Sequence, residues 1–428
     1  MEQHLSRTKK IIFWAVVSLF VLGCMEIFSF IAINKFIPAR IRDRTAFRSP
    51  EDYIAAYKRA REKRAKAVAL ESGGEGSDSR DQLRMFHPGL GWDYPAGVEY
   101  KDANGVAYAH GSMGERRTCT SFETNLISTY GDSFTYCSDV EDCRTWQTYL
   151  GEKIRANVVN FGVAGYGTDQ AYLKYELNAA GVSTPLVMLC ILPDDINRVV
   201  NVFRTFYAPE DLLALTKPRY VPKGSHFELA SNPLSRPQDA TRLEDPSFVK
   251  KLGEIDYWYE KDLNRPRLGF PYLFSLMAWR KPLAQYVTFN LGLTRTGSGK
   301  PLYPNNLFDE PEPLAIMCHI ADLFVQTATA RKSRPVMVLM PHKELIIETL
   351  KQGATRIEPL VEYLKLKQYL FIDLIRDMAE MRPTPRQLDN WYHEHATPEG
   401  NRVTAEILAQ YLEREKLLTE NERLRSNK

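Results

Sequence analysis

The first candidate for chemistry is Ser133, in the stretch Tyr130-Gly131-Asp132-Ser133 directly after an apolar run. A serine hydroxyl becomes a nucleophile when a histidine is placed to take its proton. Gly131 would let the chain turn sharply, and the N-terminus of a following helix would favour negative charge at the serine. The same stretch is also compatible with an ordinary turn and helix cap, so this motif alone leaves both interpretations open.

A second stretch, at 160–170, carries three glycines between a predicted strand and a predicted helix: Gly162, Gly165 and Gly167. Exposed backbone N–H groups in such a loop can bind an oxyanion or a phosphate group. The spacing is not the G-x-G-x-x-G fingerprint of dinucleotide-binding proteins. A nucleotide- or phosphate-binding protein is therefore the weaker interpretation.

Two further polar stretches follow the same pattern. Residues 193–198, Pro-Asp-Asp-Ile-Asn-Arg, come directly after a buried apolar run, and His395 stands just before the last predicted helix, where Thr397 and Pro398 form a cap. In parallel sheets, ligands bind beyond the carboxyl ends of the strands. We therefore expect Ser133, the glycine stretch and His395 to meet at one edge of a sheet.

The elements that must position these residues alternate along the chain. Apolar runs predict strands at 126–130, 158–161, 186–192, 336–340 and 369–374. Helices are predicted at 145–153, 169–180, 342–352 and 398–415, and a short β-rich segment at 86–120. Strands that alternate with helices indicate a parallel sheet covered on both faces, which is an α/β fold.

The order of the four stretches resembles that of the SGNH (GDSL-type) hydrolase superfamily, in particular its membrane-anchored bacterial members linked to surface polysaccharide modification. The resemblance covers about residues 87–415. It implies a three-layer α/β/α sandwich with a five-stranded parallel sheet in a flavodoxin-like layout. It also implies that Ser133 is the nucleophile, that the N–H groups of Ser133 and Gly165 bind the oxyanion, and that His395 is the base. Such enzymes cleave or transfer acyl groups, often acetyl groups on sugars, with neither metal nor cofactor.

The chain departs from this family in the oxyanion site. The family offers an asparagine amide there, whereas the matching position here is Asp194. A carboxylate repels a developing oxyanion unless it is protonated, and burial can raise its pKa. We assign Asp194 to the oxyanion site on this basis, with Asn197 as the alternative donor.

A second departure concerns the acid that orients the base. The family's acid lies two or three residues before the histidine, and Tyr392 and His393 occupy those positions. The nearest acids are Glu394 and Asp389. We predict that Asp389 completes a catalytic triad with Ser133 and His395, with a Ser133–His395 dyad as the main alternative.

A membrane segment precedes this domain. Residues 11–33 form an almost entirely apolar run of 23 residues with one charge, Glu26. About 20 helical residues cross a hydrocarbon core of about 30 Å, and the run has no small-residue cleavage site. We predict an N-terminal tail at 1–10 and an uncleaved transmembrane helix at 11–34. Glu26 would snorkel or be protonated, or would contact a partner helix.

Charge is distributed unevenly over the rest of the chain. Residues 35–70 carry a net charge of +7, whereas the whole chain carries +3. We predict a basic helical neck and linker at 35–85, with a helix that begins at Ser49-Pro50 and a flexible linker at 71–79. The neck is either a solvated spacer or is attracted to anionic lipid head groups. The body at 86–428, with a large insertion at about 203–310, gives no reason to propose nucleic acid as a partner.

The cysteines bear on the compartment. Cys137 and Cys143 flank an acidic loop just after the nucleophile, and we predict a disulfide between them, whereas Cys190 is predicted to be a buried thiol. Basic residues flank both ends of the apolar run, so the positive-inside rule does not fix the orientation. A disulfide and the ease with which long domains are translocated favour an extracytoplasmic body.

The sequence therefore predicts a membrane-anchored serine esterase or O-acyltransferase. Its substrate would be an acyl ester, with acetyl esters of a carbohydrate or polysaccharide preferred. The alternative is a non-catalytic glycan-binding or scaffold protein that retains the fold, which the acid at Asp194 and the absence of an acid at the usual position would favour.

Overall fold

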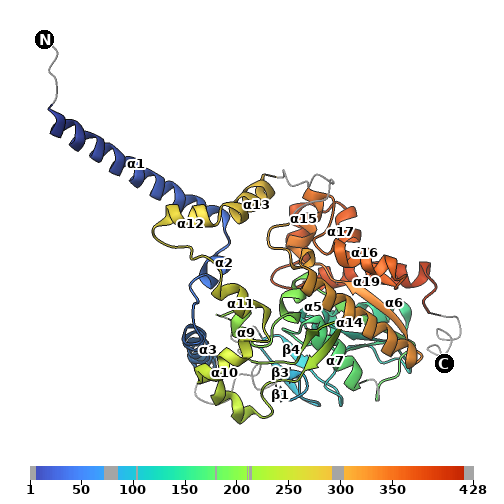
Figure 1. The fold of residues 1–428 in the computed structure, drawn as a ribbon. Helices are drawn as coiled ribbons and strands as arrows, with labels where there is room; N and C mark the ends of the chain where they lie inside the picture. Colours follow the sequence, from blue (N-terminus) through green and yellow to red (C-terminus); the bar gives the residue numbers. More distant parts are fainter. Residues whose placement is uncertain are drawn as a thin grey trace. The chain divides into compact units, whose positions relative to one another are not determined.

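The larger of two structural units contains the predicted sheet (Figure 1). A computed structural model describes residues 6–71, 85–102, 105–178, 181–209, 211, 215–291 and 303–418. The smaller unit comprises Met1–Asp52 and Glu260–Asn305, and the larger one comprises Tyr53–Tyr259 and Asn306–Lys428. The predicted linker at 71–79 lies, from residue 72 onwards, outside the described residues.

Five parallel strands form the central sheet of the larger unit. Their order across the sheet is β11 (Phe371–Asp373), β10 (Arg334–Leu339), β7 (Leu186–Ile191), β5 (Asn125–Tyr130) and β6 (Asn157–Asn160). Counted from β6, the strands run second, first, third, fourth and fifth in chain order, which is the flavodoxin-like layout. The predicted fold class and all five predicted strands are confirmed, with boundaries shifted by one or two residues.

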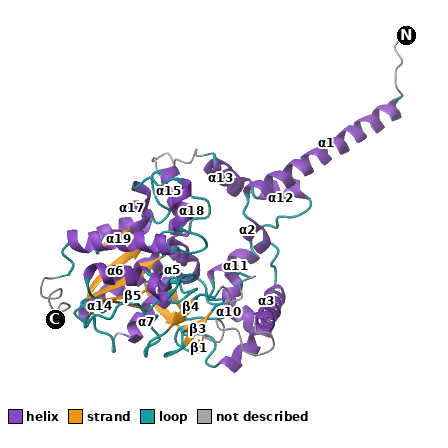
Figure 2. Cartoon of the chain, turned by 180° about the vertical axis from the view of Figure 1, so that it is seen from behind, coloured by secondary structure: helices purple, strands orange, loops and turns teal. Residues whose placement is uncertain are grey.

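Helices cover both faces of this sheet (Figure 2). The crossover from β5 to β6 contains α6 (Trp146–Ile154). The crossovers from β6 to β7, from β7 to β10 and from β10 to β11 run in the opposite direction across the sheet, and they contain α7 (Thr168–Asn178), α14 (Pro311–Ala330) and α16 (Glu358–Leu366), respectively. Because parallel crossovers are right-handed, opposite directions place these helices on opposite faces. The last helix, α19 (Pro398–Arg414), packs on α6 and completes the first layer.

Burial explains why the strands could be recognised. Every residue of β7, Leu-Val-Met-Leu-Cys-Ile, is buried, as expected for a strand covered on both faces. The predicted buried thiol, Cys190, lies in this strand. The predicted β-rich segment forms two antiparallel pairs, β1 (Met85–His87) with β2 (Gly91–Asp93) and β3 (Glu99–Lys101) with β4 (Ala107–Ala109).

The remaining elements are short. They comprise α5 (Ser133–Tyr136), α8 (Ile196–Val199), α9 (Arg204–Tyr207), β8 (Arg219–Lys223), β9 (His226–Ala230), α10 (Pro246–Gly253), α11 (Tyr257–Leu263), α15 (Lys343–Gln352), α17 (Leu374–Glu380) and α18 (Pro385–Trp391), with 3-10 turns at Asp142–Arg144, Pro193–Asp195, Pro237–Glu244 and Leu307–Asp309. Strands β8 and β9 form an antiparallel hairpin in the insertion.

The neck helix α3 (Pro50–Glu71) begins where the sequence predicts. One face of it packs on the larger unit, where the ring of Tyr53 contacts Phe206 edge-on and Tyr57 contacts Phe203. Lys58 also forms an ion pair with Glu244. This middle part of the neck is thus a packed helix, which neither of the two expected roles included.

The smaller unit is helical and contains α1 (Arg7–Phe36), α2 (Ala39–Arg44), α12 (Tyr272–Ala278) and α13 (Arg280–Asn290). Two helices among the described residues, α1 and α14, are long and apolar enough to cross a membrane. One face of α14 is buried in the core of the larger unit, with Ile316 and Phe324 fully buried. Most of α1 is exposed apolar surface instead.

The structure corrects the predicted disulfide. Cys143 is bonded to Cys119, with Cα atoms 4.8 Å apart, and not to Cys137. Cys137 adopts a left-handed conformation at the end of α5, where its thiol is buried and donates to Gln147 Oε1. Its side chain therefore points into the core, while Cys119 in the segment before β5 approaches Cys143 from outside that core.

Candidate active site

Ser133 lies where the chain leaves β5. Asp132 caps the short helix α5, and its Oδ1 accepts the N–H of Phe134 at 2.9 Å. Ser133 is the first residue of this helix, so its own N–H has no partner within the helix. The side chain is nearly buried and lines a cavity of about 230 Å³.

The cavity brings three predicted site residues together. Ser133, Gly165 and His395 all line it. They come from separate parts of the chain, since Ser133 follows β5, Gly165 follows β6 and His395 precedes α19. This is the meeting at one sheet edge that the sequence predicts, because the carboxyl ends of parallel strands lie side by side. The other lining side chains are mostly polar: Tyr94, Tyr108, Tyr136, Ser138, Asp139, Arg198, Arg204, Asp211 and Glu394, with Ala164 as the exception.

Two backbone N–H groups in this cavity are available to bind an oxyanion. Across the described part of the chain, no hydrogen bond engages the N–H of Ser133 or that of Gly165. Gly165 has φ +82°, a conformation that favours glycine. Gly162 fits tightly, since a Cβ there would lie 2.3 Å from the backbone nitrogen of Tyr136. The glycine loop is therefore pressed against the segment that follows the nucleophile.

The imidazole of His395 is held by an acid that the sequence did not indicate. Its Nδ1 lies 2.6 Å from Oδ2 of Asp139, six residues after Ser133. Asp139 has φ +72°, which aspartate tolerates better than most residues, and its N–H donates to the Tyr108 hydroxyl at 3.0 Å. With Nδ1 engaged in this way, Nε2 is the nitrogen left to act on a substrate or nucleophile.

The candidate nucleophile and the candidate base are not in contact in this structure. Within the described residues, no hydrogen bond joins Ser133 Oγ to His395, although both line the same cavity. The ring of His395 packs on Phe134, the residue after the nucleophile, with ring centroids 5.1 Å apart. Catalytic hydrogen bonds are often long without substrate and tighten in the complex.

Asp389 is not placed where the triad prediction requires. Its carboxylate forms an ion pair with Lys343 and is largely exposed. Residue 389 lies in α18, and its side chain reaches Lys343 at the start of α15. The other acid considered, Glu394, lines the cavity, while Asp139 holds the imidazole.

Asp194, which was predicted for the oxyanion site, does not line the cavity and pairs with a histidine instead. Its Oδ2 lies 3.0 Å from Nε2 of His342. Burial alone would raise the pKa of Asp194, but the bond to His342 and the charge of that ring outweigh burial and lower the pKa. An ionised carboxylate has no proton to offer an oxyanion. Asn197 does not replace it, because it does not line the cavity, and its amide donates to the backbone carbonyl of Asp194.

Arg198, in the same polar stretch, connects three parts of the site. One guanidinium nitrogen donates to Asp195 Oδ1 at 2.7 Å, to the Tyr166 carbonyl at 2.8 Å and to Asp132 Oδ2 at 3.3 Å. Burial lowers the pKa of Arg198, but Asp195 and Asp132 raise it further, so the guanidinium stays charged. It thereby joins the cap of the nucleophile helix to the loop of Gly165.

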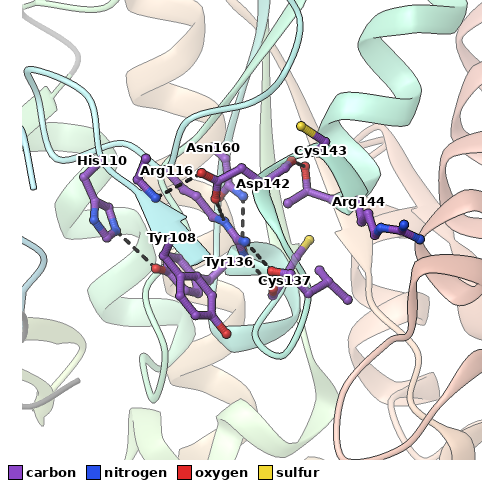
Figure 3. Close-up of polar contacts among 12 residues, drawn as sticks. Tyr108, His110, Arg116, Tyr136, Cys137, Asp142, Cys143, Arg144 and Asn160 are labelled. Atoms are coloured by element: carbon purple, nitrogen blue, oxygen red, sulfur yellow. Dashed lines mark hydrogen bonds and ion pairs between the residues drawn. The ribbon is translucent and has the colours of Figure 1, made fainter. Parts of the chain in front are cut away.

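Arg116 holds the loop that carries the orienting acid (Figure 3). Its buried guanidinium donates to Asp142 Oδ1 at 2.9 Å, and also to the carbonyls of Tyr136 at 2.7 Å, Cys137 and Val140. One side chain thus bridges both ends of the loop after the nucleophile. Charge-assisted bonds of this kind are stronger than neutral ones, so the loop path is tightly specified.

Asp139 and Arg116 are the functional residues that sequence reasoning missed. A signal for Asp139 was available, because it lies in the acidic loop at 138–142 directly after the nucleophile. The sequence carried no such signal for Arg116, because it does not distinguish this buried arginine from its exposed neighbour Arg117. Over the described part of the chain, no group of three or more histidine, cysteine, aspartate or glutamate side chains is placed to hold a metal ion.

Comparisons with known proteins give weak similarity only. No protein-family model and no curated protein matches the sequence. Two similar solved structures are described as lipolytic proteins of the G-D-S-L family. The one from Desulfitobacterium hafniense DCB-2 is 12% identical with a TM-score of 0.33, and the match covers 67% of this chain and 99% of that one. The one from Veillonella parvula DSM 2008 is 12% identical with a TM-score of 0.33, and the match covers 68% of this chain and 100% of that one. At these scores the matches carry no argument about activity, which is taken below from the site itself.

Proposed function

We propose that this chain is a membrane-anchored serine esterase or O-acyltransferase of the SGNH type. The observation that carries the proposal is the bond from His395 Nδ1 to Asp139, in a cavity that also holds Ser133 and the unengaged N–H of Gly165. This set supplies a nucleophile, an oriented base and oxyanion donors, which are the parts that acyl transfer through a serine requires.

The proposed reaction has two halves. The Ser133 oxygen attacks the acyl carbon while its proton moves to Nε2 of His395, and the tetrahedral oxyanion is held by the N–H groups of Ser133 and Gly165. The imidazolium then returns the proton to the leaving alcohol as the carbon–oxygen bond breaks, which leaves an acyl-serine. Water or a second alcohol, activated by the same imidazole, attacks that ester and releases an acid or a new ester.

The lining of the cavity supports a short acyl group on a polar alcohol. A volume of about 230 Å³ surrounded by tyrosine hydroxyls and charged side chains suits an acetyl group and a sugar better than a fatty acyl chain. A long alkyl chain would cover those polar groups and leave them without partners, at a cost of about 1–3 kcal/mol each. We therefore propose acetyl esters of a carbohydrate as the substrate class.

The decisive experiment uses a fluorophosphonate probe, which reacts only with an activated serine. Labelling and turnover of p-nitrophenyl acetate are expected in the purified full chain in detergent and are expected to disappear in Ser133→Ala. Ser121→Ala, an exposed serine of the same domain, is the matched control and should retain both. Labelling of Ser133→Ala would overturn Ser133 as the nucleophile, whereas a folded wild type that neither labels nor turns over any ester would leave the non-catalytic glycan-binding alternative.

We also propose that α1 spans a bilayer and that the body is extracytoplasmic. The length and exposed apolar surface of α1 support the anchor. The disulfide between Cys119 and Cys143 supports an oxidising compartment for the larger unit. Head groups of anionic lipids are proposed as partners of the basic residues at 35–70 that lie next to the anchor in the chain.

A further inference from the structure

The insertion contributes a short helix that packs directly on the apolar helix α1. Trp279 and Tyr286 are buried against Ile33 and Ile37 in one small core within the smaller unit. Figure 1 shows α12 lying alongside the end of α1, and the ring of Tyr272 contacts Phe30 edge-on. The helix therefore shares the environment of the last turns of α1.

Glu26 fixes where α12 begins along α1. Its carboxylate accepts the backbone N–H of Tyr272 at 2.6 Å and that of Leu273 at 3.1 Å, the first two residues of α12. The apolar run of α1 continues for seven more residues to Ile33. At 1.5 Å per residue, α12 begins about 10 Å before the end of that run.

Several polar groups around α12 are paired within the protein. The hydroxyl of the buried Ser275 bonds to the Arg267 and Gly269 carbonyls, and the Gly269 N–H donates to the same oxygen at 3.1 Å. Trp279 Nε1 donates to the Pro266 carbonyl at 2.8 Å. Such pairing lowers the cost of placing non-helical backbone at membrane depth, where unsatisfied polar groups are expensive.

The outward face of this segment is apolar, and none of the residues that the structure describes covers it. The exposed fractions are 79% for Phe270, 69% for Phe274 and 58% for Met277. Exposed apolar groups of this size on adjacent turns mark an interaction surface. Two cations, Arg280 and Lys281, follow α12, and such residues commonly anchor a segment at the membrane–water interface.

We propose that residues 268–279 form a re-entrant segment that enters the hydrocarbon beside α1 and returns through α12. The lipid bilayer is the partner of Phe270, Phe274 and Met277. The anchor would then consist of one spanning helix and one re-entrant segment, joined by the carboxylate of Glu26. A charge inside the membrane is costly unless it is paired, and the two N–H groups of α12 supply that pairing. The inference rests on the proposed anchoring role of α1.

The test measures cysteine reactivity in lipid nanodiscs that hold one chain each, so that a second copy cannot cover the surface. The background is Cys24→Ser with Cys318→Ser, in which the remaining free thiols, Cys137 and Cys190, are buried. Phe270→Cys is compared with Leu366→Cys, a position of equal exposure in the body, at 80%. The reagent is a charged maleimide that does not enter lipid.

Because the reactive thiolate does not form in hydrocarbon, we expect labelling at Phe270→Cys to be at least about 10-fold slower than at Leu366→Cys. The two rates should become equal after denaturation in SDS. A third variant, Phe20→Cys in α1, separates this inference from the anchor. Protection at residue 20 with rapid labelling at residue 270 would overturn the re-entrant segment and leave the anchor, whereas rapid labelling at both would overturn both.

Discussion

The assignment of Asp139 as the orienting acid leads to a quantitative prediction for Asp139→Asn. In the structure the carboxylate accepts from His395 Nδ1 at 2.6 Å. The amide that replaces it can donate its own N–H to Nδ1, which would hold the imidazole in the wrong tautomer. Asparagine also tolerates the left-handed backbone at this position, so the loop should keep its path.

The magnitude follows from the charge that Asp139 places beside the imidazolium. Two unit charges about 4 Å apart attract by about 4 kcal/mol at an effective dielectric constant of 20, and each 1.36 kcal/mol is a factor of about ten in rate. Solvent reduces this value, because the side chains of His395 and Asp139 are 22% and 38% exposed. We expect kcat to fall by about 10²–10³, with a much smaller change in KM.

The assay is steady-state hydrolysis of p-nitrophenyl acetate from pH 5 to 9, after circular dichroism has shown that each variant is folded. Asp389→Asn is the matched control, since that carboxylate pairs with Lys343 at the surface, and its kcat should stay within about two-fold. A large loss in Asp389→Asn with near-normal activity in Asp139→Asn would refute the assignment and restore the acid expected from the sequence.

Two further predictions concern groups that support the site. Arg116→Met should lower the free energy of unfolding by about 3–5 kcal/mol, because it removes the ion-pair partner of Asp142 and the donor to several carbonyls. The control is Arg117→Met at the exposed neighbouring position, which should change the free energy of unfolding by less than about 0.5 kcal/mol in the same urea titration. Equal losses in the two variants would contradict the role of Arg116. Burial opposes the charge of His342, but its bonds to Asp194 and Glu344 raise its pKa from 6.5 to about 9. The contribution of protonated His342 to the stability of the folded chain should therefore be complete below pH 6.5 and disappear as pH rises through about 9. The Tm difference between wild type and His342→Gln should shrink over that interval, and a constant difference would count against the pair.

The predictable part of the fold is the part encoded over short stretches of chain. Strand β7 was recognisable because burial on both faces requires a continuous apolar run. The start of α3 was recognisable from Pro50 and the acids that follow it. The edge at which Ser133, Gly165 and His395 meet followed from the order of strands and helices, because in a parallel sheet the carboxyl ends of the strands share one side.

The pairing of side chains could not be obtained in this way. Asp139 and Asp389 are both acids in polar segments near a candidate residue, and only the folded path of the loop brings Asp139, 256 positions away in the chain, to His395. The same holds for the disulfide, where Cys119 and Cys137 were both available to Cys143. Proximity in sequence favoured Cys137, while its position at the end of α5 turned its thiol into the core.

The sequence by itself determined the long apolar helix near the N-terminus, the α/β class and three residues of the candidate site. Each of these depends on hydrophobic period, turn chemistry or strand order, which are local properties or simple consequences of chain order. The tertiary structure decided which acid orients His395, that Asp194 pairs with His342, and that Glu26 binds the start of α12. These contacts join residues far apart in the chain, so they depend on where loops and the insertion come to lie, which no local pattern specifies.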